Sequence, residues 1–230
     1  MVNLSGRHVV VGGGAGALGQ AVVDLFAREG AICHVPVRGL AVPSPRSGVE
    51  FATGVDLTSE SAVATFYAAL PNELWASVHL AGGFAMGGIT ETSLGDLRSQ
   101  IDMNVVTAFL CCREAVRRFR IRSGGGGGRI VNVASRAALQ PGGPATAYSL
   151  AKAAVVSLTT TLADELKTEQ ILVNAVAPGI IDTPTNRSAM PDLDASHLVT
   201  PAKIASVIVW LASPENSVAS GAVIPVYGNS

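Results

Sequence analysis

Four polar side chains are of the types that carry out acid–base chemistry on a carbonyl or alcohol oxygen. Tyr148 and Lys152 are four residues apart at the start of a predicted helix, so they lie on one face of it. A free tyrosine has a pKa of about 10, and to act as an acid near pH 7 it needs a pKa roughly three units lower. A cation and a helix N-terminus both lower the pKa of a phenol, so the spacing predicts that Lys152 activates Tyr148.

Two further residues, Ser135 and Asn104, complete a candidate catalytic set. Ser135 ends a predicted strand thirteen residues before Tyr148, where its hydroxyl can hold a substrate carbonyl oxygen beside the phenol. Asn104 lies in the long helix before that strand, where its amide can hold a water between Lys152 and bulk solvent. A tyrosine–lysine pair on a helix is usually part of a solvated face, but the ordered set of four predicts catalysis.

A glycine-rich segment, residues 12–19, separates the first predicted strand from the first predicted helix. The strand is expected over Arg7–Gly12 and the helix over Ala17–Arg28, where apolar residues recur at helical spacing. Glycines in such a turn let the backbone approach a pyrophosphate, and the helix N-terminus offers free N–H groups to it. The segment predicts a dinucleotide-binding turn; a tight turn without a ligand is the alternative.

The end of the second predicted strand, Ala31–Val37, indicates which dinucleotide is bound. An acidic residue there would bind the adenine ribose hydroxyls of NAD, whereas an arginine would attract the 2′-phosphate of NADP. No carboxylate is present and Arg38 comes next, so NADP(H) is favoured over NAD(H), unless Arg38 is only a solvated loop charge. Asp56 and Leu57 follow the third strand, where the carboxylate either accepts from the adenine amino group or serves as a turn residue.

Strands and helices alternate along the sequence. The remaining strands are expected at Val49–Thr53, Ala76–Leu80, Arg129–Val133, Ile171–Ala177 and Ala222–Val226. The remaining helices are expected after a cap at Thr58 or Ser59 and at Leu94–Phe119, Ala147–Lys167 and Pro201–Leu211. Residues 124–128 are interpreted as a glycine connector and residues 178–200 as irregular. This alternation predicts a single α/β domain over residues 1–230, a parallel sheet with helices on both faces.

The composition predicts a folded protein without nucleic-acid or membrane partners. The 230 residues are 48% hydrophobic and 14% charged, which excludes a disordered chain. The net charge of −1 argues against a nucleic-acid-binding protein, and no apolar run reaches the roughly 18–20 residues of a membrane helix. Three cysteines without metal-ligand spacing and an N-terminus without signal-peptide features predict a cytoplasmic protein with reduced thiols and no metal. The sparse charge predicts a homo-oligomer.

The same residues resemble the short-chain dehydrogenase/reductase family across essentially the whole length. The family pattern is Thr-Gly-x-x-x-Gly-x-Gly, then Asn-Asn-Ala-Gly, then Asn, Ser, Tyr-x-x-x-Lys and Pro-Gly. This chain matches it at Gly13, Gly19, Ala81, Gly82, Asn104, Ser135, Tyr148, Lys152, Pro178 and Gly179. It departs from the pattern with Gly12 in place of the threonine, Ala17 in place of the middle glycine, and His79 and Leu80 in place of the asparagines.

The resemblance implies a doubly wound, Rossmann-type sheet of seven strands in the order 3-2-1-4-5-6-7, and hydride transfer between NADPH and a carbonyl or alcohol substrate. Tyr148 would protonate the oxygen, Lys152 would hold the ribose and lower the tyrosine pKa, and Ser135 would position the substrate. The implied cofactor-binding residues are Gly13, Ala15, Ala17, Leu18, Gly19, Arg38, Asp56, Leu57, Ala81, Gly82, Tyr148, Lys152, Pro178, Gly179, Ile181 and Thr183. The two long helices would build a dimer or tetramer interface, and residues 184–200 would form the substrate lid.

A second, local resemblance is to the dihydropteridine reductases, which recycle a quinonoid dihydropterin. It rests on residues 13–19, 81–84, 182–187 and 190–191. Those enzymes use NADH with an acidic residue after strand two, where this chain has Val37, and they lack the serine found here at Ser135. Pterin reduction is therefore the alternative substrate hypothesis, and a non-catalytic nucleotide-binding scaffold or redox sensor is the alternative of another class.

Overall fold

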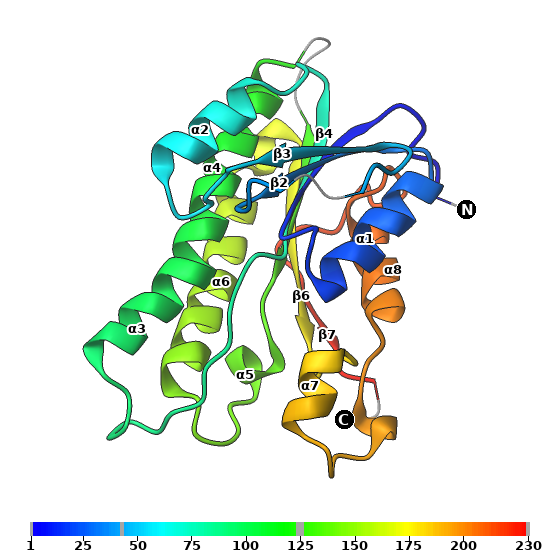
Figure 1. The fold of residues 1–230 in the computed structure, drawn as a ribbon. Helices are drawn as coiled ribbons and strands as arrows, with labels where there is room; N and C mark the ends of the chain where they lie inside the picture. The colour runs from blue at the N-terminus through cyan, green and yellow to red at the C-terminus, as the bar shows by residue number, and fades with distance from the viewer. Residues whose placement is uncertain (1, 42–43, 123–126, 229–230) are drawn as a thin grey trace.

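The computed structural model describes residues 2–41, 44–122 and 127–228 (Figure 1). Seven strands form one parallel sheet in the order β3-β2-β1-β4-β5-β6-β7. The strands are β1 (His8–Gly12), β2 (Ile32–Val37), β3 (Val49–Thr53), β4 (Leu74–His79), β5 (Gly128–Val133), β6 (Ile171–Pro178) and β7 (Val223–Val226). The predicted fold class and strand order are confirmed.

Helices cover both faces of the sheet, as Figure 1 shows. The helices are α1 (Ala17–Arg28), α2 (Glu60–Ala68), α3 (Leu94–Ile101), α4 (Thr107–Arg120), α5 (Arg136–Leu139), α6 (Thr146–Glu165), α7 (Pro184–Ala189) and α8 (Pro201–Leu211). Helices α1 and α8 pack together on one face, and α2, α4 and α6 cover the other. Short turns of other helix types are η1 (Asp102–Val106), η2 (Lys167–Glu169) and η3 (Ala195–His197).

Successive residues of the central strands contribute to two different apolar cores. Val9 and Val11 of β1 belong to the core that also holds Phe26 of α1, whereas Val10 belongs to the core that holds Phe119 of α4. Because side chains alternate across a strand and both faces of this sheet are covered, the strand is a continuous run of valines. The two cores fix the carboxyl ends of the strands, where the polar candidate residues lie.

Two predicted segments differ from the structure. The helix expected over Leu94–Phe119 is interrupted, because the π-helical turn η1 lies between α3 and α4. The region expected to be irregular, residues 178–200, contains α7, whose N-terminus is capped by the Thr183 side chain and begins with Pro184. A helix of six residues has too few turns to show an apolar repeat.

Helix α2 is capped by Ser59 and not by Thr58, since the Ser59 side chain accepts a hydrogen bond from the backbone of Ala62. The predicted glycine connector, residues 124–128, lies mostly outside the described residues, and Gly128 is already the first residue of β5. Within the ranges that the structure describes, no helix has the length and apolar character needed to cross a membrane.

Candidate active site

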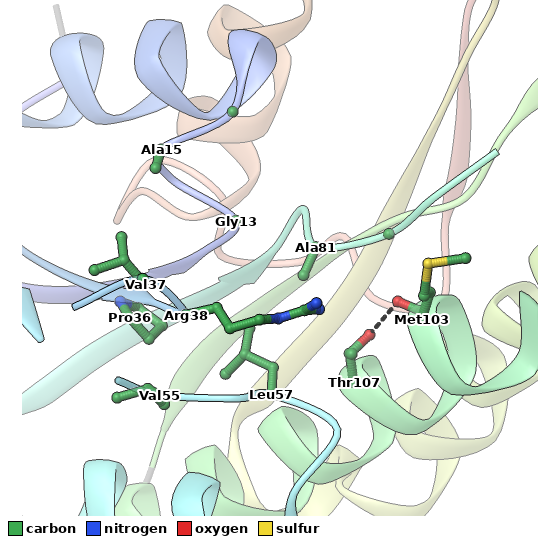
Figure 2. Close-up of a pocket in the computed structure, with 13 residues that line it drawn as sticks. Gly13, Ala15, Pro36, Val37, Arg38, Val55, Leu57, Ala81, Met103 and Thr107 are labelled. Carbon is green, nitrogen blue, oxygen red and sulfur yellow. Dashed lines mark hydrogen bonds between the residues drawn. The ribbon is translucent and has the colours of Figure 1, made fainter. Parts of the chain in front are cut away.

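A cleft opens at the carboxyl edge of the sheet, where the chain leaves the neighbouring strands β1 and β4 toward opposite faces (Figure 1). β1 continues into α1 on one face, and β4 leads to α3 and α4 on the other. Parallel α/β sheets bind ligands at such a reversal of strand order. The cleft has a volume of about 320 Å³. Figure 2 shows its lining, which is Gly13, Ala15, Gly16, Pro36, Val37, Arg38, Gly39, Val55, Leu57, Ala81, Gly82, Met103 and Thr107.

The predicted cofactor-binding residues fall into three groups. Those that line the cleft are Gly13, Ala15, Arg38, Leu57, Ala81 and Gly82. Ala17, Leu18 and Gly19 form the first turn of α1, next to the cleft-lining Gly16. The others lie outside the cleft lining: Asp56, Tyr148, Lys152, Pro178, Gly179, Ile181 and Thr183.

Close backbone contacts explain the glycines at Gly13 and Gly19. Gly13 has a φ of +81°, and a Cβ there would lie 2.6 Å from the backbone nitrogen of Ala81. A Cβ on Gly19 would collide with the Gly13 carbonyl oxygen. A Cβ on Gly12, where the family pattern has threonine, would meet its nearest neighbours at the ordinary distances of 3.5 and 3.6 Å. Gly13 and Gly19 therefore let β1, β4 and α1 approach closely at the cleft.

Arg38 lines the cleft just after β2, and Asp56 lies between the lining residues Val55 and Leu57 after β3 without lining the cleft itself. Arg38 is exposed, and Figure 2 shows its side chain extending from β2 into the cleft beside Leu57. The Oδ1 atom of Asp56 accepts hydrogen bonds from the backbone nitrogen (2.9 Å) and the hydroxyl (2.8 Å) of Thr58. These bonds, with a smaller contribution from the Arg38 charge, lower the pKa of Asp56. Asp56 therefore serves as a turn residue here, with its Oδ2 making no hydrogen bond to a described residue.

Ser135, Tyr148 and Lys152 meet at the carboxyl end of β5. Ser135 caps α5, and its side chain is hydrogen bonded to that of Tyr148 in the first turn of α6. Lys152 follows one helical turn later, with its Nζ 5.9 Å from the centre of the Tyr148 ring. Nζ also donates a hydrogen bond of 2.8 Å to the backbone carbonyl of Val133 in β5. The capping serine and the start of α6 thus bring a hydroxyl, a phenol and an amine together.

Asn104 lies in the π-helical turn η1, and its buried side chain is held on several sides. Its Nδ2 donates to the Gly83 carbonyl (3.0 Å) and to the backbone (3.0 Å) and side-chain (3.2 Å) oxygens of Gln100. Its Oδ1 accepts from the Gly83 backbone nitrogen at 3.3 Å. Single π turns inside helices are frequent at functional sites. This one orients an amide side chain toward the loop after β4.

The ionisation of Tyr148 differs from the prediction made for it. Burial raises the pKa of Tyr148, and the hydrogen bond from Ser135 offsets only part of the effect. Desolvation outweighs any benefit from the amine of Lys152, whose own pKa falls from its ordinary value of 10.5 to about 8 because the charged form is buried. Tyr148 is therefore protonated at neutral pH in this structure, the form needed to donate a proton to a carbonyl oxygen.

The cost of burying Lys152 predicts that a methionine there stabilises the protein. The pKa of Lys152 is lowered from 10.5 to about 8, so below pH 8 the amine is charged in both the folded and the unfolded protein. Keeping this charge buried lowers the free energy of unfolding by up to about 3 kcal/mol. This loss of stability becomes smaller as the pH rises from 8 to 10.5, because the folded amine is then neutral and the amine of the unfolded chain becomes easier to deprotonate. Urea unfolding should show that Lys152→Met has a higher free energy of unfolding than wild type at pH 7, and that this difference is smaller at pH 10. A loss of stability at both pH values would contradict this explanation.

The segment after β6 holds the last predicted cofactor residues. Pro178 ends β6, and the backbone nitrogen of Gly179 donates to Val226 at 3.1 Å. Ile181 pairs with Val199, which joins the two ends of the predicted lid. The hydroxyl of Thr183 caps α7. This segment therefore has a fixed base and a short helix, and its role as a lid stays a prediction.

Several residues at the site were not predicted from the sequence. The ring of Phe84 packs edge-on against the ring of Tyr148 with centroids 4.9 Å apart, although 61% of Phe84 is exposed. Met103 and Thr107, on either side of Asn104 in the chain, line the cleft. Their positions one residue before and three residues after Asn104 were the available signal. His79, by contrast, is buried in β4 and bonded to other side chains, away from the cleft lining.

A parallel sheet with a glycine turn, a cleft at the reversal of strand order and a Ser–Tyr–Lys cluster defines a Rossmann-type NAD(P)-dependent oxidoreductase. The sequence profile described as "short chain dehydrogenase" matches residues 7–194. The chain belongs to the short-chain dehydrogenase/reductase family.

Relatives with known sequences extend the similarity over nearly the whole chain. The uncharacterized oxidoreductase YgfF of Escherichia coli (strain K12) is 30% identical, with 95% of this chain and 98% of that protein covered. The 3-oxoacyl-[acyl-carrier-protein] reductase MabA of Mycobacterium tuberculosis (strain ATCC 25618 / H37Rv) is 31% identical, with 96% and 92% covered. The 2,5-dichloro-2,5-cyclohexadiene-1,4-diol dehydrogenase of Sphingobium indicum is also 31% identical, with 99% and 98% covered.

Solved structures share the fold. A short chain dehydrogenase/reductase family protein superposes with a TM-score of 0.89 at 28% identity, covering 98% of this chain and 97% of that one. The structure named "ElxO with NADP Bound" superposes with a TM-score of 0.88 at 24% identity, covering 97% of this chain and 98% of that one. The shared architecture extends through the whole sheet.

Proposed function

We propose that this protein reduces a carbonyl substrate to an alcohol with NADPH, or catalyses the reverse oxidation. The observation that carries the proposal is the cluster of Ser135, Tyr148 and Lys152 at the edge of the sheet that also carries the cleft. Burying the amine of Lys152 costs free energy, and a scaffold without catalysis would gain nothing from it. A strongly perturbed buried lysine beside a tyrosine is a recognised mark of a functional site.

The cleft has the features that bind the adenosine and pyrophosphate of NADP(H). The missing Cβ of Gly13 leaves backbone accessible to a pyrophosphate, and α1 begins with no side-chain hydrogen bond to its first N–H groups, those of Ala17 and Leu18. Arg38 would bind the 2′-phosphate, and the free oxygen of Asp56 would bind the adenine amino group. The other proposed contacts are Ala15, Gly19, Leu57, Ala81 and Gly82, with Pro178, Gly179, Ile181 and Thr183 at the nicotinamide.

The four candidate catalytic residues have separate roles in this proposal. The bound cofactor supplies the hydride. Ser135 donates a hydrogen bond to the substrate oxygen, and Tyr148 transfers its proton to that oxygen as the alcohol forms. Lys152, when charged, stabilises the phenolate that Tyr148 leaves behind and binds the cofactor ribose. Asn104 holds the loop after β4 against the helix and keeps a polar path beside Lys152.

The choice of cofactor depends on Arg38, which predicts a selective loss in Arg38→Ala. The affinity for NADPH should fall at least about tenfold, or 1.4 kcal/mol, because a charged hydrogen-bonding partner of the 2′-phosphate is removed. The affinity for NADH should stay unchanged. Fluorescence titration of both nucleotides measures this, with Arg28→Ala at the exposed end of α1 as the matched control. Equal effects on NADPH and NADH would contradict the role of Arg38.

The substrate is proposed only as a class. Two relatives that are equally identical in sequence to this chain are named for different substrates, a 3-oxoacyl group on acyl-carrier protein and a chlorinated cyclic diol. Sequence identity therefore does not distinguish between these substrate classes. Phe84 packs against Tyr148, Met86 precedes Gly87, which forms a β-bridge, and both apolar side chains are exposed. They favour a substrate with an apolar group beside the reacting carbonyl. NADPH oxidation with aryl ketones, a 3-oxoacyl thioester and a quinonoid dihydropterin tests the class. Turnover of the dihydropterin far above the ketones would select pterin reduction.

We further propose a homo-oligomer formed through α4 and α6. Exposed apolar side chains on these helices, Phe109 and Leu150, support it. A monomer in sedimentation at micromolar concentration would exclude the oligomer.

Three free, buried cysteines support a reducing, cytoplasmic location: Cys33, Cys111 and Cys112.

A further inference from the structure

Three arginines converge on one tryptophan at the amino edge of the sheet, which is the edge opposite the proposed cofactor cleft. Trp75 is the second residue of β4, and its indole Nε1 donates a hydrogen bond of 2.8 Å to the Ala212 carbonyl. Arg7 precedes β1, Arg129 is the second residue of β5, and Arg122 follows α4. Their Cζ atoms lie 3.6, 5.0 and 5.5 Å, respectively, from the centre of the Trp75 ring. Segments that are distant in sequence therefore bring three positive charges to one place.

The three cations repel one another. Burial and the charge of Arg122 lower the pKa of Arg7, and the exposed Glu215 offsets only part of this effect. Burial and the charges of Arg122 and Arg7 also lower the pKa of Arg129. Each guanidinium is attracted to the face of the indole, but this attraction does not neutralise its charge. An anion placed among the three side chains would therefore lower the electrostatic energy of the cluster.

The guanidinium of Arg129 is buried against neutral acceptors. Only 9% of Arg129 is exposed, and its Nε and Nη2 donate to the Asn216 carbonyl at 3.1 and 2.9 Å, while its Nη1 donates to the Gly128 carbonyl at 3.0 Å. In the ranges that the structure describes, neither Arg129 nor Arg7 forms an ion pair with a carboxylate. Buried charges in proteins are usually paired with an opposite charge. The described part of the chain thus supplies no anion for this buried cation.

A fourth arginine lies against the segment that leads into Trp75. Arg118 is one helical turn before Arg122, is 9% exposed, and donates from Nη2 to the Leu70 carbonyl and to Asn72 Oδ1. Its buried Nε has no hydrogen-bond partner among the described residues. The positive charge at this edge therefore extends along the end of α4 and includes a buried donor that the described residues leave unused.

We propose that Arg7, Arg122, Arg129 and Trp75 form a binding site for a phosphate group, carried by inorganic phosphate, pyrophosphate or a phosphorylated small molecule. The planar guanidinium matches phosphate oxygens with paired N–H donors, and a phosphate carries enough charge and oxygens to bind more than one arginine. Arg7 is partly exposed and its side chain donates no hydrogen bond to a described residue, so its donors can turn from the indole to a ligand. This Trp75 site is separate from the proposed active site, because it lies at the other edge of the sheet.

The fluorescence of Trp75 provides a direct test of this site. The chain has two tryptophans, and Trp210 is partly exposed on α8, so Trp210→Phe leaves Trp75 as the only reporter. Titration with pyrophosphate at constant ionic strength should change this fluorescence and reach saturation. The affinity should fall at least about tenfold in Arg7→Gln and less in Arg7→Lys, which keeps the charge. Arg28→Gln, at the exposed end of α1, is the matched control and should bind as before.

Thermal unfolding checks the same site without the Trp210 substitution. Because a ligand that binds only the folded state stabilises it, pyrophosphate should raise the Tm of the wild-type protein and not that of Arg7→Gln. If Arg7→Gln lowers the Tm equally with and without pyrophosphate, Arg7 only packs against Trp75 and the proposal fails. Sodium chloride at the same ionic strength should not reproduce the effect; an equal rise in Tm would mean that the salt only screens the repulsion.

The proposed cofactor cleft is the competing site for pyrophosphate, and Arg38→Ala separates the two. The Trp75 site predicts an unchanged affinity for pyrophosphate in Arg38→Ala and a loss in Arg7→Gln. The reverse pattern would place pyrophosphate in the cleft and overturn the proposal. Titrations with inorganic phosphate and with glycerol 3-phosphate, a phosphate monoester, identify the carrier that binds most tightly. Citrate binding as tight as that of every phosphate compound would contradict a site for phosphate.

Discussion

Replacing Tyr148 by phenylalanine should lower kcat about a thousandfold and leave the affinity for NADPH nearly unchanged. The variant loses the hydroxyl that is hydrogen bonded to Ser135 and that we propose as the proton donor. Tyr148 does not line the cofactor cleft, so the glycine turn and Arg38 should bind the nucleotide as before. Steady-state kinetics and fluorescence titration of the same preparation measure the two quantities.

A second tyrosine in the same fold provides the control for Tyr148→Phe. Tyr67 is fully buried, and its hydroxyl forms a hydrogen bond of 2.7 Å with Ser77, in a region that does not line the cleft. Tyr67→Phe should cost about 1 kcal/mol of folding free energy and leave kcat unchanged. If Tyr148→Phe keeps more than about a tenth of the wild-type kcat, another group donates the proton.

The glycine turn gives the second large effect, in Gly13→Ala. Two costs add there: a φ of +81° disfavours any side chain, and the new Cβ would lie 2.6 Å from the Ala81 nitrogen and 2.9 Å from its Cα. Because all the contacting atoms are backbone, relief requires β1 and β4 to separate at the cleft. We expect a loss of about 3 kcal/mol or more in stability and no measurable NADPH binding.

Gly12→Ala is the matched control for Gly13→Ala. The neighbouring position has only ordinary contacts, with the Leu57 side chain at 3.5 Å and the Val78 carbonyl at 3.6 Å. Its unfolding free energy should change by less than about 1 kcal/mol, and NADPH should still bind. Urea unfolding measures the free energy of unfolding of the two variants, and fluorescence titration with NADPH measures their affinity for the cofactor. Similar behaviour of both variants would show that the close approach of the turn to β4 does not matter.

Much of the fold could be predicted from the sequence because its signals are local. Runs such as Val9–Val11 mark strands buried on both faces, and Gly30 marks the end of α1 with a positive φ of 88°. The interruption at η1 and the short helix α7 could not be predicted in this way. The turn η1 holds Asn104, whose side chain bonds to Gly83, a residue distant in sequence, and α7 has only six residues, too few to show an apolar repeat.

The sequence was sufficient to predict which residues form the candidate site, but not how the site changes their pKa values. Ser135, Tyr148 and Lys152 could be chosen from order and spacing, since the ends of parallel strands and the starts of helices share one edge of the sheet. The direction of the Tyr148 pKa depends on how deeply the phenol is buried, and spacing carries no information on burial. The packing of Phe84 on Tyr148 likewise joins a loop and a helix more than sixty residues apart.

Transfer of an isotopic label tests the central claim most directly. The wild-type protein should be incubated with NADPH that carries deuterium at C4 of the nicotinamide and with the carbonyl panel, and the products analysed by mass spectrometry. We predict that an alcohol forms with one deuterium on its carbinol carbon, and that Tyr148→Phe forms almost none. Tight NADPH binding without any labelled alcohol would contradict the proposed hydride transfer to a carbonyl and favour a nucleotide-binding scaffold.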